Sequence, residues 1–338
     1  MNQPRPRPGR PVTIRNVAAL AGVSVGTASK ALNRRGQLRQ ETRDRVLAAA
    51  EQLNFRPNEA ARSLGSERTF TVGLITTDSI GRFSIPVLLG AEDALDAGTI
   101  SVFLCDTRDD PIRERHYVET LLSRRVDGVI VTGRRSDPRP PLASDLPVPV
   151  VYALTPSRDP ADCSVVADDE HAGFLAGEHL IATGRRAIAY VTGPDRFDAV
   201  GRREKGLGTA LANHGLELAG PVLYGEWSEA WGRRAAQTLL RSRTGFDSIY
   251  CGSDQIGRGA IEGLLAAGRT VPGDVAVVGT DNWDVMVEGR RPSLTTIDLS
   301  LHEVGRRAAQ HLLAAIDGQP VQGLETVPAQ LILGESTD

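Results

Sequence analysis

The chain has 338 residues, of which 41% are hydrophobic and 24% are charged, and its formal net charge is −3. No apolar run approaches the roughly 20 residues that span a bilayer, and the first residues lack the apolar segment of a signal peptide, so the sequence predicts a cytoplasmic protein without membrane association. The three cysteines, Cys105, Cys163 and Cys251, stand far apart and in no CxxC pair, which indicates reduced thiols and argues against a disulfide framework.

The small net charge hides two parts of opposite sign. Residues 1–68 contain 13 basic and 5 acidic side chains, a balance of +8, whereas residues 69–338 contain 26 basic and 37 acidic side chains, a balance of −11. A basic segment neutralises phosphates and releases counterions when it binds nucleic acid. The amino-terminal part is therefore a candidate nucleic-acid-binding head on an acidic body.

Within this head, residues 1–11 are predicted to form a disordered leader, and residues 12–33 two short helices joined by a tight turn. Thr13 can cap the first helix, Gly22 supplies the turn and Ser24 caps the second helix. Apolar side chains recur at helical spacing in both segments. The pattern is typical of a helix-turn-helix, whose second helix enters the DNA major groove, with an ordinary helical hairpin as the alternative.

A third helix is predicted at 40–55, ended by Pro57, and a short helix follows between Asn58 and Gly65. From Thr71 the pattern alternates between strands and helices. The predicted strands are 71–76, 100–104, 127–132, 148–153, 188–192, 221–224, 247–251, 275–279, 294–298 and 329–333. The predicted helices are 84–97, 111–124, 171–183, 202–214, 229–242, 257–267 and 302–317. This alternation predicts parallel sheets in two lobes, with a ligand cleft at the carboxyl ends of the strands.

Motifs of catalysis are absent or misplaced. Ser24 in GVSVG follows a predicted helix and not a strand, so it does not fit a nucleophile elbow. No phosphate-cradling glycine motif follows a strand, and the six histidines form no H-x-x-x-H pair. We therefore expect no catalytic residue, no cofactor and no metal, and keep an α/β enzyme with an accessory DNA-binding head as an alternative.

From Val12 to about Ser336 the chain resembles the lactose-repressor/galactose-repressor (LacI–GalR) family of bacterial transcription regulators. The matching motifs are TIRNVAALAGVSVGTASKALN, FRPNEAARSL, RVDGVIV, GRRAIAYVTG, CGSDQIGRGA, VPGDVAVVGTDN and RPSLTTI. The resemblance implies a small all-α helix-turn-helix head with a hinge helix, joined to a two-lobed α/β body like that of type I periplasmic binding proteins. It divides the chain into a DNA-binding domain at 12–57, a hinge at 58–68, and an effector-binding and dimerisation domain at 69–338.

The resemblance also implies which residues contact DNA. Val25, Gly26 and Lys30 stand at base-reading positions of the second helix, where Lys30 can donate to guanine as a point charge. The hinge helix folds on operator binding and inserts Leu64 between base pairs of the minor groove, unless Leu64 only anchors the linker to the body. The whole predicted DNA-binding set is Thr13, Ser24, Val25, Gly26, Thr27, Ser29, Lys30, Asn33, Asn58, Ala61, Arg62 and Leu64.

For the effector, the resemblance places an aromatic pocket residue at Trp227, a ligand-gripping arginine at Arg203 and an acidic pocket residue at Asp281. Sugar sites stack a ring on an aromatic side chain and bind hydroxyl groups with charged or amide side chains. Core packing or a solvated ion pair is the alternative for each. The whole predicted effector set is Phe83, Ser84, Phe197, Asp198, Arg203, Trp227, Ser253, Asp254, Asp281 and Trp283.

Three positions depart from the family pattern. Ser253 stands where many members have asparagine, Gly334 replaces a common arginine, and Asn16 replaces a usual aspartate. The sequence thus predicts a homodimeric repressor of a pseudo-palindromic operator, controlled by a small effector, expected to be a sugar. The alternatives are a sugar-sensing protein without an operator, and an activator that responds to a nucleobase or a phosphorylated metabolite.

Overall fold

The computed structural model of the protein describes residues 12–32, 37–55, 68–95, 100–143, 146–242, 245–287 and 291–337. By its internal contacts the chain divides into two compact units, Met1–Thr69 and Phe70–Asp338. None of the helices in the described ranges is long and apolar enough to cross a membrane.

In its described part the first unit consists of the helices α1 (Ile14–Ala21), α2 (Val25–Leu32) and α3 (Gln40–Gln52). Their shared core is made of small apolar side chains, namely Val17, Ala18, Ala21, Ala28, Ala31, Val46, Ala49 and Ala50. Small side chains let the helices approach closely and leave the outer faces polar. Leu47 is 46% exposed, whereas Val46 and Ala49 of the same helix lie in the core.

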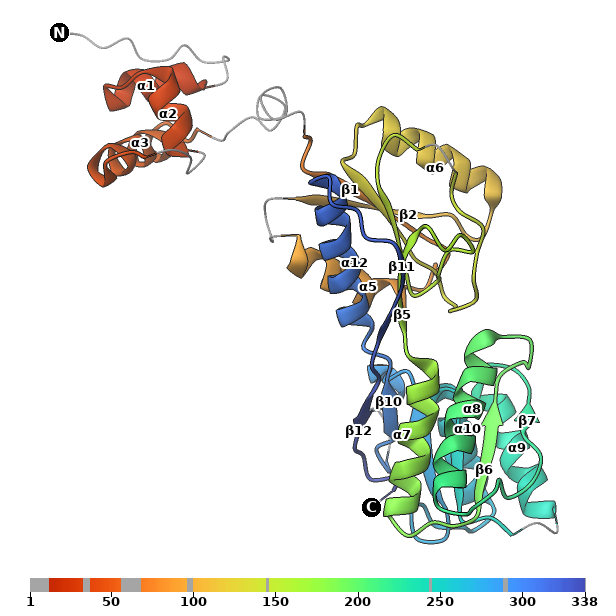
Figure 1. The fold of residues 1–338 in the computed structure, drawn as a ribbon. Coiled ribbons are helices and arrows are strands. Elements are labelled where there is room, and N and C mark those ends of the chain that lie inside the picture. The colour runs from red at the N-terminus through yellow and green to blue at the C-terminus, as the bar shows by residue number, and fades with distance from the viewer. Residues whose placement is uncertain are drawn as a thin grey trace. The chain divides into compact units, whose positions relative to one another are not determined.

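The second unit contains twelve described strands and eight described helices (Figure 1). The strands are β1 (Thr71–Thr76), β2 (Ser101–Asp106), β3 (Gly128–Val131), β4 (Val150–Ala153), β5 (Cys163–Ala167), β6 (Ile188–Thr192), β7 (Leu223–Tyr224), β8 (Ser248–Cys251), β9 (Ala276–Thr280), β10 (Thr295–Asp298), β11 (Gly323–Val327) and β12 (Gln330–Ile332). The helices are α5 (Ser84–Ala94), α6 (Pro111–Ser123), α7 (Asp169–Ala182), α8 (Asp198–Asn213), α9 (Glu229–Arg241), α10 (Asp254–Ala266), α11 (Asp284–Val287) and α12 (Leu301–Ile316).

These strands form two sheets, each the centre of one lobe. The sheet of the amino-terminal lobe has the order β11–β5–β4–β3–β1–β2, and that of the carboxy-terminal lobe β12–β10–β9–β8–β6–β7. Because side chains alternate between the faces of a strand, each sheet buries apolar residues on both faces. In the first lobe α5 and α12 cover one face and α6 the other; in the second, α7 and α8 cover one face and α9 and α10 the other.

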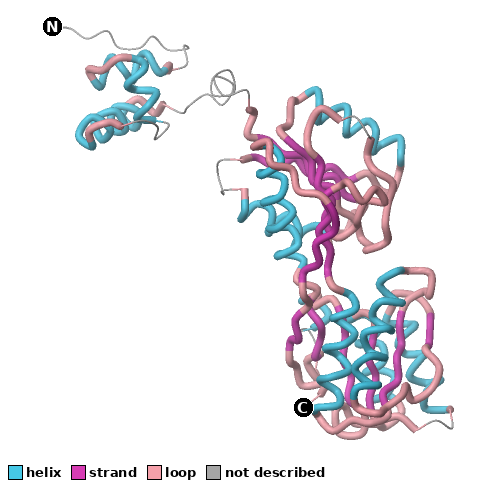
Figure 2. The backbone as a smooth tube through the Cα atoms, viewed as in Figure 1, coloured by secondary structure: helices cyan, strands magenta, loops and turns pink. Residues whose placement is uncertain are grey.

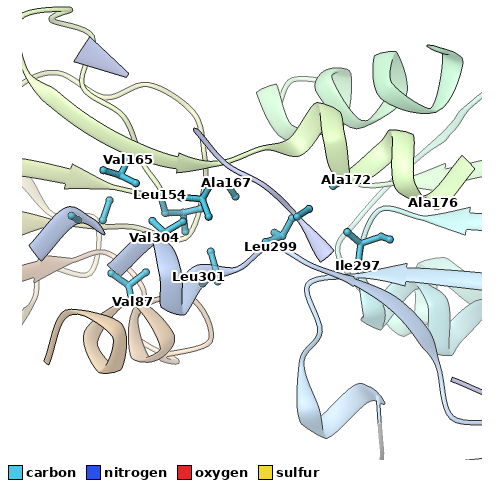
Figure 3. Packing of buried hydrophobic residues seen from close by; sticks show 14 of the residues in the cluster. Val87, Leu154, Val165, Ala167, Ala172, Ala176, Ile297, Leu299, Leu301 and Val304 are labelled. Atoms are coloured by element: carbon cyan, nitrogen blue, oxygen red, sulfur yellow. The ribbon is translucent and has the colours of Figure 1, made fainter. Parts of the chain in front are cut away.

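The chain passes between the lobes three times, after β5, β10 and β11 (Figure 2). The passages are joined to one another, because the Asp168 backbone N–H donates to the Val327 carbonyl at 2.9 Å and the Ser300 hydroxyl to the Pro328 carbonyl at 2.9 Å. Leu299 is buried between the lobes, where one apolar cluster runs from Val87 and Val304 to Ala172 and Ile297 (Figure 3). A shared core and three passages are what a hinged two-lobe body requires.

The predicted alternation is confirmed, with four differences. The short helix α11 was not predicted, nor were the strands β5 and β11, which pair with each other at one end of the first sheet. The strand predicted at 329–333 is β12, and it pairs antiparallel with β10, so the second sheet is not wholly parallel as expected. An antiparallel edge strand on a parallel sheet is common in such folds.

Candidate functional site

Helix α2 exposes three of the positions predicted to contact DNA, namely Val25, Gly26 and Lys30. The Thr27 backbone N–H donates to Ser24 Oγ at 3.1 Å, so Ser24 caps the helix as its sequence position predicted. Thr27 and Ser29 are half-buried. A Cβ added to Gly26 would meet only Ser24 Oγ, at 3.8 Å, so this surface accepts a side chain without a clash.

At the start of α1, Thr13 occupies the cap position. The backbone N–H of Thr13 donates to Asn16 Oδ1 at 2.9 Å, and the Thr13 hydroxyl donates to the same oxygen at 2.7 Å. Asn16, noted above as a departure, therefore keeps a capping role without a charge. Gly22 ends the helix at a φ of 66°, in the left-handed region that favours glycine. The predicted hinge helix and the predicted residues Asn33, Asn58, Ala61, Arg62 and Leu64 lie outside the described residues.

A cleft of about 730 Å³ lies between the two lobes of the body. Most of its lining lies in segments that follow β1, β3 and β4 in one lobe and β6, β7, β8 and β9 in the other. Parallel strands bring their carboxyl ends to one edge of a sheet, so both lobes turn this edge toward the cleft. The volume falls in the usual range for a small-molecule site.

Arg203 of α8 is the central cation of the cleft, and its side chain is 6% exposed. Its Nε donates to Asp169 Oδ1 at 2.8 Å and one of its terminal nitrogens to the Gly252 carbonyl at 2.7 Å. Burial opposes its charge, and the carboxylates of Asp169 and Asp281 outweigh this effect, so its pKa is raised. The second oxygen of Asp169 accepts from the Ser136 hydroxyl at 2.9 Å, which ties this network to the amino-terminal lobe.

Arg82, in the loop after β1, reaches across to the carboxy-terminal lobe. It forms an ion pair with Asp281 and donates to Gln255 Oε1 at 3.1 Å. Its guanidinium lies over the rings of Phe83, at 4.9 Å, and Trp283, at 4.6 Å. Its buried Nε has no partner among the described residues. Arg82 is therefore a contact between the lobes that retains a free donor.

Asp281 follows β9, and its side chain is 7% exposed. Burial raises the pKa of this carboxyl, while Arg82 and Arg203 act in the opposite direction. With two arginines beside it, Asp281 is a strong acceptor for a ligand hydroxyl.

Asp254 starts α10 and has a structural role. It accepts hydrogen bonds from the Thr296 hydroxyl at 2.5 Å and the Trp283 backbone N–H at 2.7 Å. Burial, and then the nearby Asp281 carboxylate, raise the pKa of Asp254 to about 7. Both carboxylate oxygens are occupied, so Asp254 fixes the loop after β9 and holds Asp281 in place.

Two aromatic side chains of the cleft lining, both from the carboxy-terminal lobe, stack on each other. The Phe197 and Trp227 rings stack at 6.3 Å between centroids. The Trp227 ring also lies against Gly193, where an added Cβ would approach it to 2.2 Å. The guanidinium groups of Arg135 and Arg196 lie over the Phe197 ring at 5.2 Å and 4.7 Å. This arrangement offers aromatic faces beside polar groups.

Of the predicted effector residues, six line the cleft: Phe83, Phe197, Arg203, Trp227, Ser253 and Asp281. The other four do not line it: Ser84, Asp198, Asp254 and Trp283. Ser84 is buried and bonded to Asp78, whereas Asp198 is exposed at the start of α8. Trp283 packs on Arg82. An effector contact by these four residues stays a prediction.

Sequence reasoning missed several lining residues, chiefly Asp78, Arg82, Ser136 and Asp169. Asp78 and Ser136 follow the predicted strands β1 and β3, so their position after a strand was an available signal. Asp169 follows β5, a strand that was not predicted. Within the described residues no cluster of three His, Cys, Asp or Glu side chains could hold a metal ion.

Two family profiles match the chain, one to each unit. Residues 13–58 match bacterial regulatory proteins of the lacI family, and residues 69–332 match periplasmic binding proteins and the sugar binding domain of the LacI family. The transcriptional regulator CelR of Thermobifida fusca is 34% identical and aligns over 95% of both chains. The transcriptional repressor PurR of Mannheimia succiniciproducens is 31% identical over 90% of this chain and 92% of the relative.

Solved structures agree with these matches. A complex of the transcriptional regulator CelR with cellobiose has a TM-score of 0.67 and 31% identity, over 97% of this chain and 100% of the other. The Lac repressor dimer bound to operator and the anti-inducer ONPF has a TM-score of 0.73 and 25% identity, over 97% of this chain and 99% of the other.

Proposed function

Because the chain belongs to the LacI family of bacterial regulatory proteins, we propose that it is a transcriptional repressor that binds operator DNA as a homodimer and responds to a sugar. In this proposal residues 12–57 bind DNA, residues 58–68 form the hinge, and residues 69–338 bind the effector and the second subunit. Two heads on a two-fold axis match a pseudo-palindromic operator.

The observation that carries the sugar assignment is the composition of the cleft. Hydroxyl-rich ligands need charged donors and acceptors beside an aromatic face. Arg203 and Asp281 supply the first, and Phe197 with Trp227 supplies the second. The buried carboxylates Asp169 and Asp281 are balanced by arginines, which favours a neutral ligand.

We also propose that the protein is not an enzyme, since the family members named above are regulators. We propose that the protein acts in the cytoplasm because its function requires access to the bacterial chromosome.

The homodimer is supported by exposed apolar side chains on neighbouring segments of the amino-terminal lobe. Helix α5 exposes Ile85 and Leu89, and β2, the edge strand of its sheet, exposes Phe103 and Leu104. Exposed apolar residues on an edge strand need a partner to avoid aggregation. A Leu104→Glu variant should shift the dimer to monomer in analytical ultracentrifugation, whereas a wild-type monomer would contradict the dimer.

The effector acts through a difference in affinity between two arrangements of the body. An inducer binds the DNA-free arrangement better, and a corepressor binds the DNA-bound arrangement better. A ligand hydroxyl that binds Asp281 competes with Arg82 for this carboxylate. Because the Arg82–Asp281 ion pair joins the two lobes, ligand binding and the arrangement of the lobes are linked.

The first test is a tryptophan-fluorescence titration with cellobiose, maltose, lactose, glucose and ribose, checked by calorimetry. Trp227→Phe should abolish most of the signal, and Trp231→Phe is the matched control because Trp231 lies outside the lining and donates to the Thr192 carbonyl at 2.9 Å. Saturable binding of one sugar is the expected result. Binding of hypoxanthine or glucose 6-phosphate, with none of the sugars, would overturn the sugar assignment in favour of the nucleobase or phosphorylated-metabolite alternative.

Operator binding is tested by selecting sequences from a random DNA pool with the full-length protein. We expect an enriched pseudo-palindrome whose affinity falls steeply with salt. Lys30→Ala should lose the preference at particular base pairs while non-specific binding remains. Enrichment of no sequence would contradict an operator-binding repressor and favour a sugar-sensing protein without an operator.

A further inference from the structure

A second pocket of about 630 Å³ adjoins the cleft on the amino-terminal lobe. It shares part of its wall with the cleft, namely Arg134, Arg135, Asp137, Arg196 and Phe197. A ligand that fills the cleft can therefore continue into this pocket past the Phe197 ring.

The floor of the second pocket is a row of threonines at the carboxyl ends of β1–β4. Thr77, Thr107, Thr132 and Thr155 follow β1, β2, β3 and β4, and the sheet order β4–β3–β1–β2 sets them side by side. The Thr107 hydroxyl donates to the Thr76 carbonyl at 3.1 Å, and the Thr155 hydroxyl donates to the Arg135 carbonyl. Each of these oxygens can still accept a hydrogen bond.

Thr132 differs from its neighbours. It is 1% exposed, and its hydroxyl has no hydrogen-bond partner in the described part of the chain. A buried polar group without a partner is unfavourable and calls for an explanation. A ligand in the second pocket would supply the missing partner.

The lining of the second pocket is nearly balanced in charge, with five arginines and four carboxylates. Arg139 pairs with Glu114 at 2.7 Å, and Asp109 lies 3.4 Å from Arg134 and 3.9 Å from Arg135. A nearly balanced lining offers little attraction to a phosphate or a carboxylate. Hydroxyl groups on the floor and a shared aromatic wall suit a neutral sugar unit.

We propose that the effector is an oligosaccharide of at least three units, with one terminal unit in the second pocket and the chain passing Phe197. This inference rests on the proposed sugar-binding function of the cleft. It specifies the length of the ligand, which the cleft alone does not.

The test compares the affinities of di- and trisaccharides by calorimetry, using cellobiose with cellotriose and maltose with maltotriose. The trisaccharide of the recognised series should bind about three- to tenfold more tightly, the value of one net hydrogen bond. Thr132→Val removes the unpartnered hydroxyl at nearly constant volume and should fold at least as stably as the wild type. It should abolish most of the trisaccharide's advantage over the disaccharide.

A second variant blocks the pocket. Pro140→Trp adds bulk at an exposed position of its wall and should reduce trisaccharide affinity more than disaccharide affinity. Pro160→Trp is the matched control, since Pro160 is also exposed and lines neither pocket. Equal affinities of the wild type for di- and trisaccharides would overturn the proposal that a sugar unit binds in the second pocket. Tighter binding of the trisaccharide that persists unchanged in both Thr132→Val and Pro140→Trp would do the same. Either result would leave the sugar-binding function of the cleft intact. Binding of no saccharide would overturn both.

Discussion

The buried ion pair of Arg203 and Asp169 is the element of the cleft with the clearest energetic consequence. The Asp169 side chain is 2% exposed and contacts two guanidinium nitrogens, at 2.8 Å and 2.7 Å. Replacing one member of a buried pair leaves an uncompensated charge, which destabilises a protein by about 3–5 kcal/mol. We therefore expect Arg203→Met to lower the free energy of unfolding of the body by about this amount.

Asp169→Asn leaves Arg203 with the Gly252 carbonyl and with Asp281 at 4.0 Å, so its effect should be smaller. The double variant, Arg203→Met with Asp169→Asn, leaves neither buried charge of the pair without its partner. Its destabilisation should therefore fall at least about 1 kcal/mol short of the sum of the single effects. This shortfall measures the coupling of the pair and not the loss of packing.

The assay is equilibrium urea denaturation of the full-length protein, followed by tryptophan fluorescence. Trp227, Trp231 and Trp283 all belong to the second unit, so the signal reports unfolding of the body alone. Additivity of the two single effects, to within about 0.5 kcal/mol, would refute the reasoning, since independent sites behave in that way.

Three further predictions concern other parts of the chain. Because the pKa of Asp254 is raised to about 7, above its unfolded value of about 3.9, its bound proton stabilises the fold below about pH 4 and this contribution is lost as the pH rises to about 7. Stability measured as the urea midpoint should therefore decline between about pH 4 and pH 7, and Asp254→Asn should flatten this decline. An unchanged decline in the variant would contradict the raised pKa of Asp254. Gly305→Ala should destabilise by about 1–3 kcal/mol because its Cβ would meet the Val87 carbonyl at 2.0 Å. Gly201→Ala, with open space around it, should stabilise by about 0.5–1 kcal/mol, and equal effects of the two would contradict the packing argument. Lys30→Ala should weaken operator binding by about 1–3 kcal/mol in gel-shift titrations and leave sugar affinity unchanged, whereas unchanged specificity would remove Lys30 from base reading.

Local patterns in the sequence predicted most of the fold. Helix caps and the spacing of apolar residues depend on residues that lie close together in the sequence. Ser24, which caps α2 by accepting from the Thr27 backbone N–H, is one example. The missed strand β11 lacks such signals, because it alternates half-buried and exposed residues at the end of its sheet. The missed strand β5 is a buried run, CSVVA, as long as the predicted strands β6 and β9, so its signal was present and was overlooked.

The site was less predictable because its contacts join distant parts of the chain. Arg82 and Asp281 are 199 residues apart, and nothing local to either residue indicates the pair. Asp254 has the chemistry of a ligand contact, but its oxygens are taken by Thr296 and the Trp283 backbone. Residue type and position after a strand identify candidates; only the three-dimensional contacts separate those that face the ligand from those that support it.

The Arg82–Asp281 contact gives the proposed regulation a physical basis. Arg82 belongs to one lobe and Asp281 to the other, so any ligand group that takes Asp281 changes the energy of the contact between the lobes. A ligand shifts an equilibrium only by its difference in affinity for the two states, and coupling is reciprocal. Operator DNA must then change sugar affinity by the same factor by which the sugar changes operator affinity. Arg82→Ala removes the shared contact, so it should bring this common factor close to one, whereas an unchanged factor would show that regulation follows a different route.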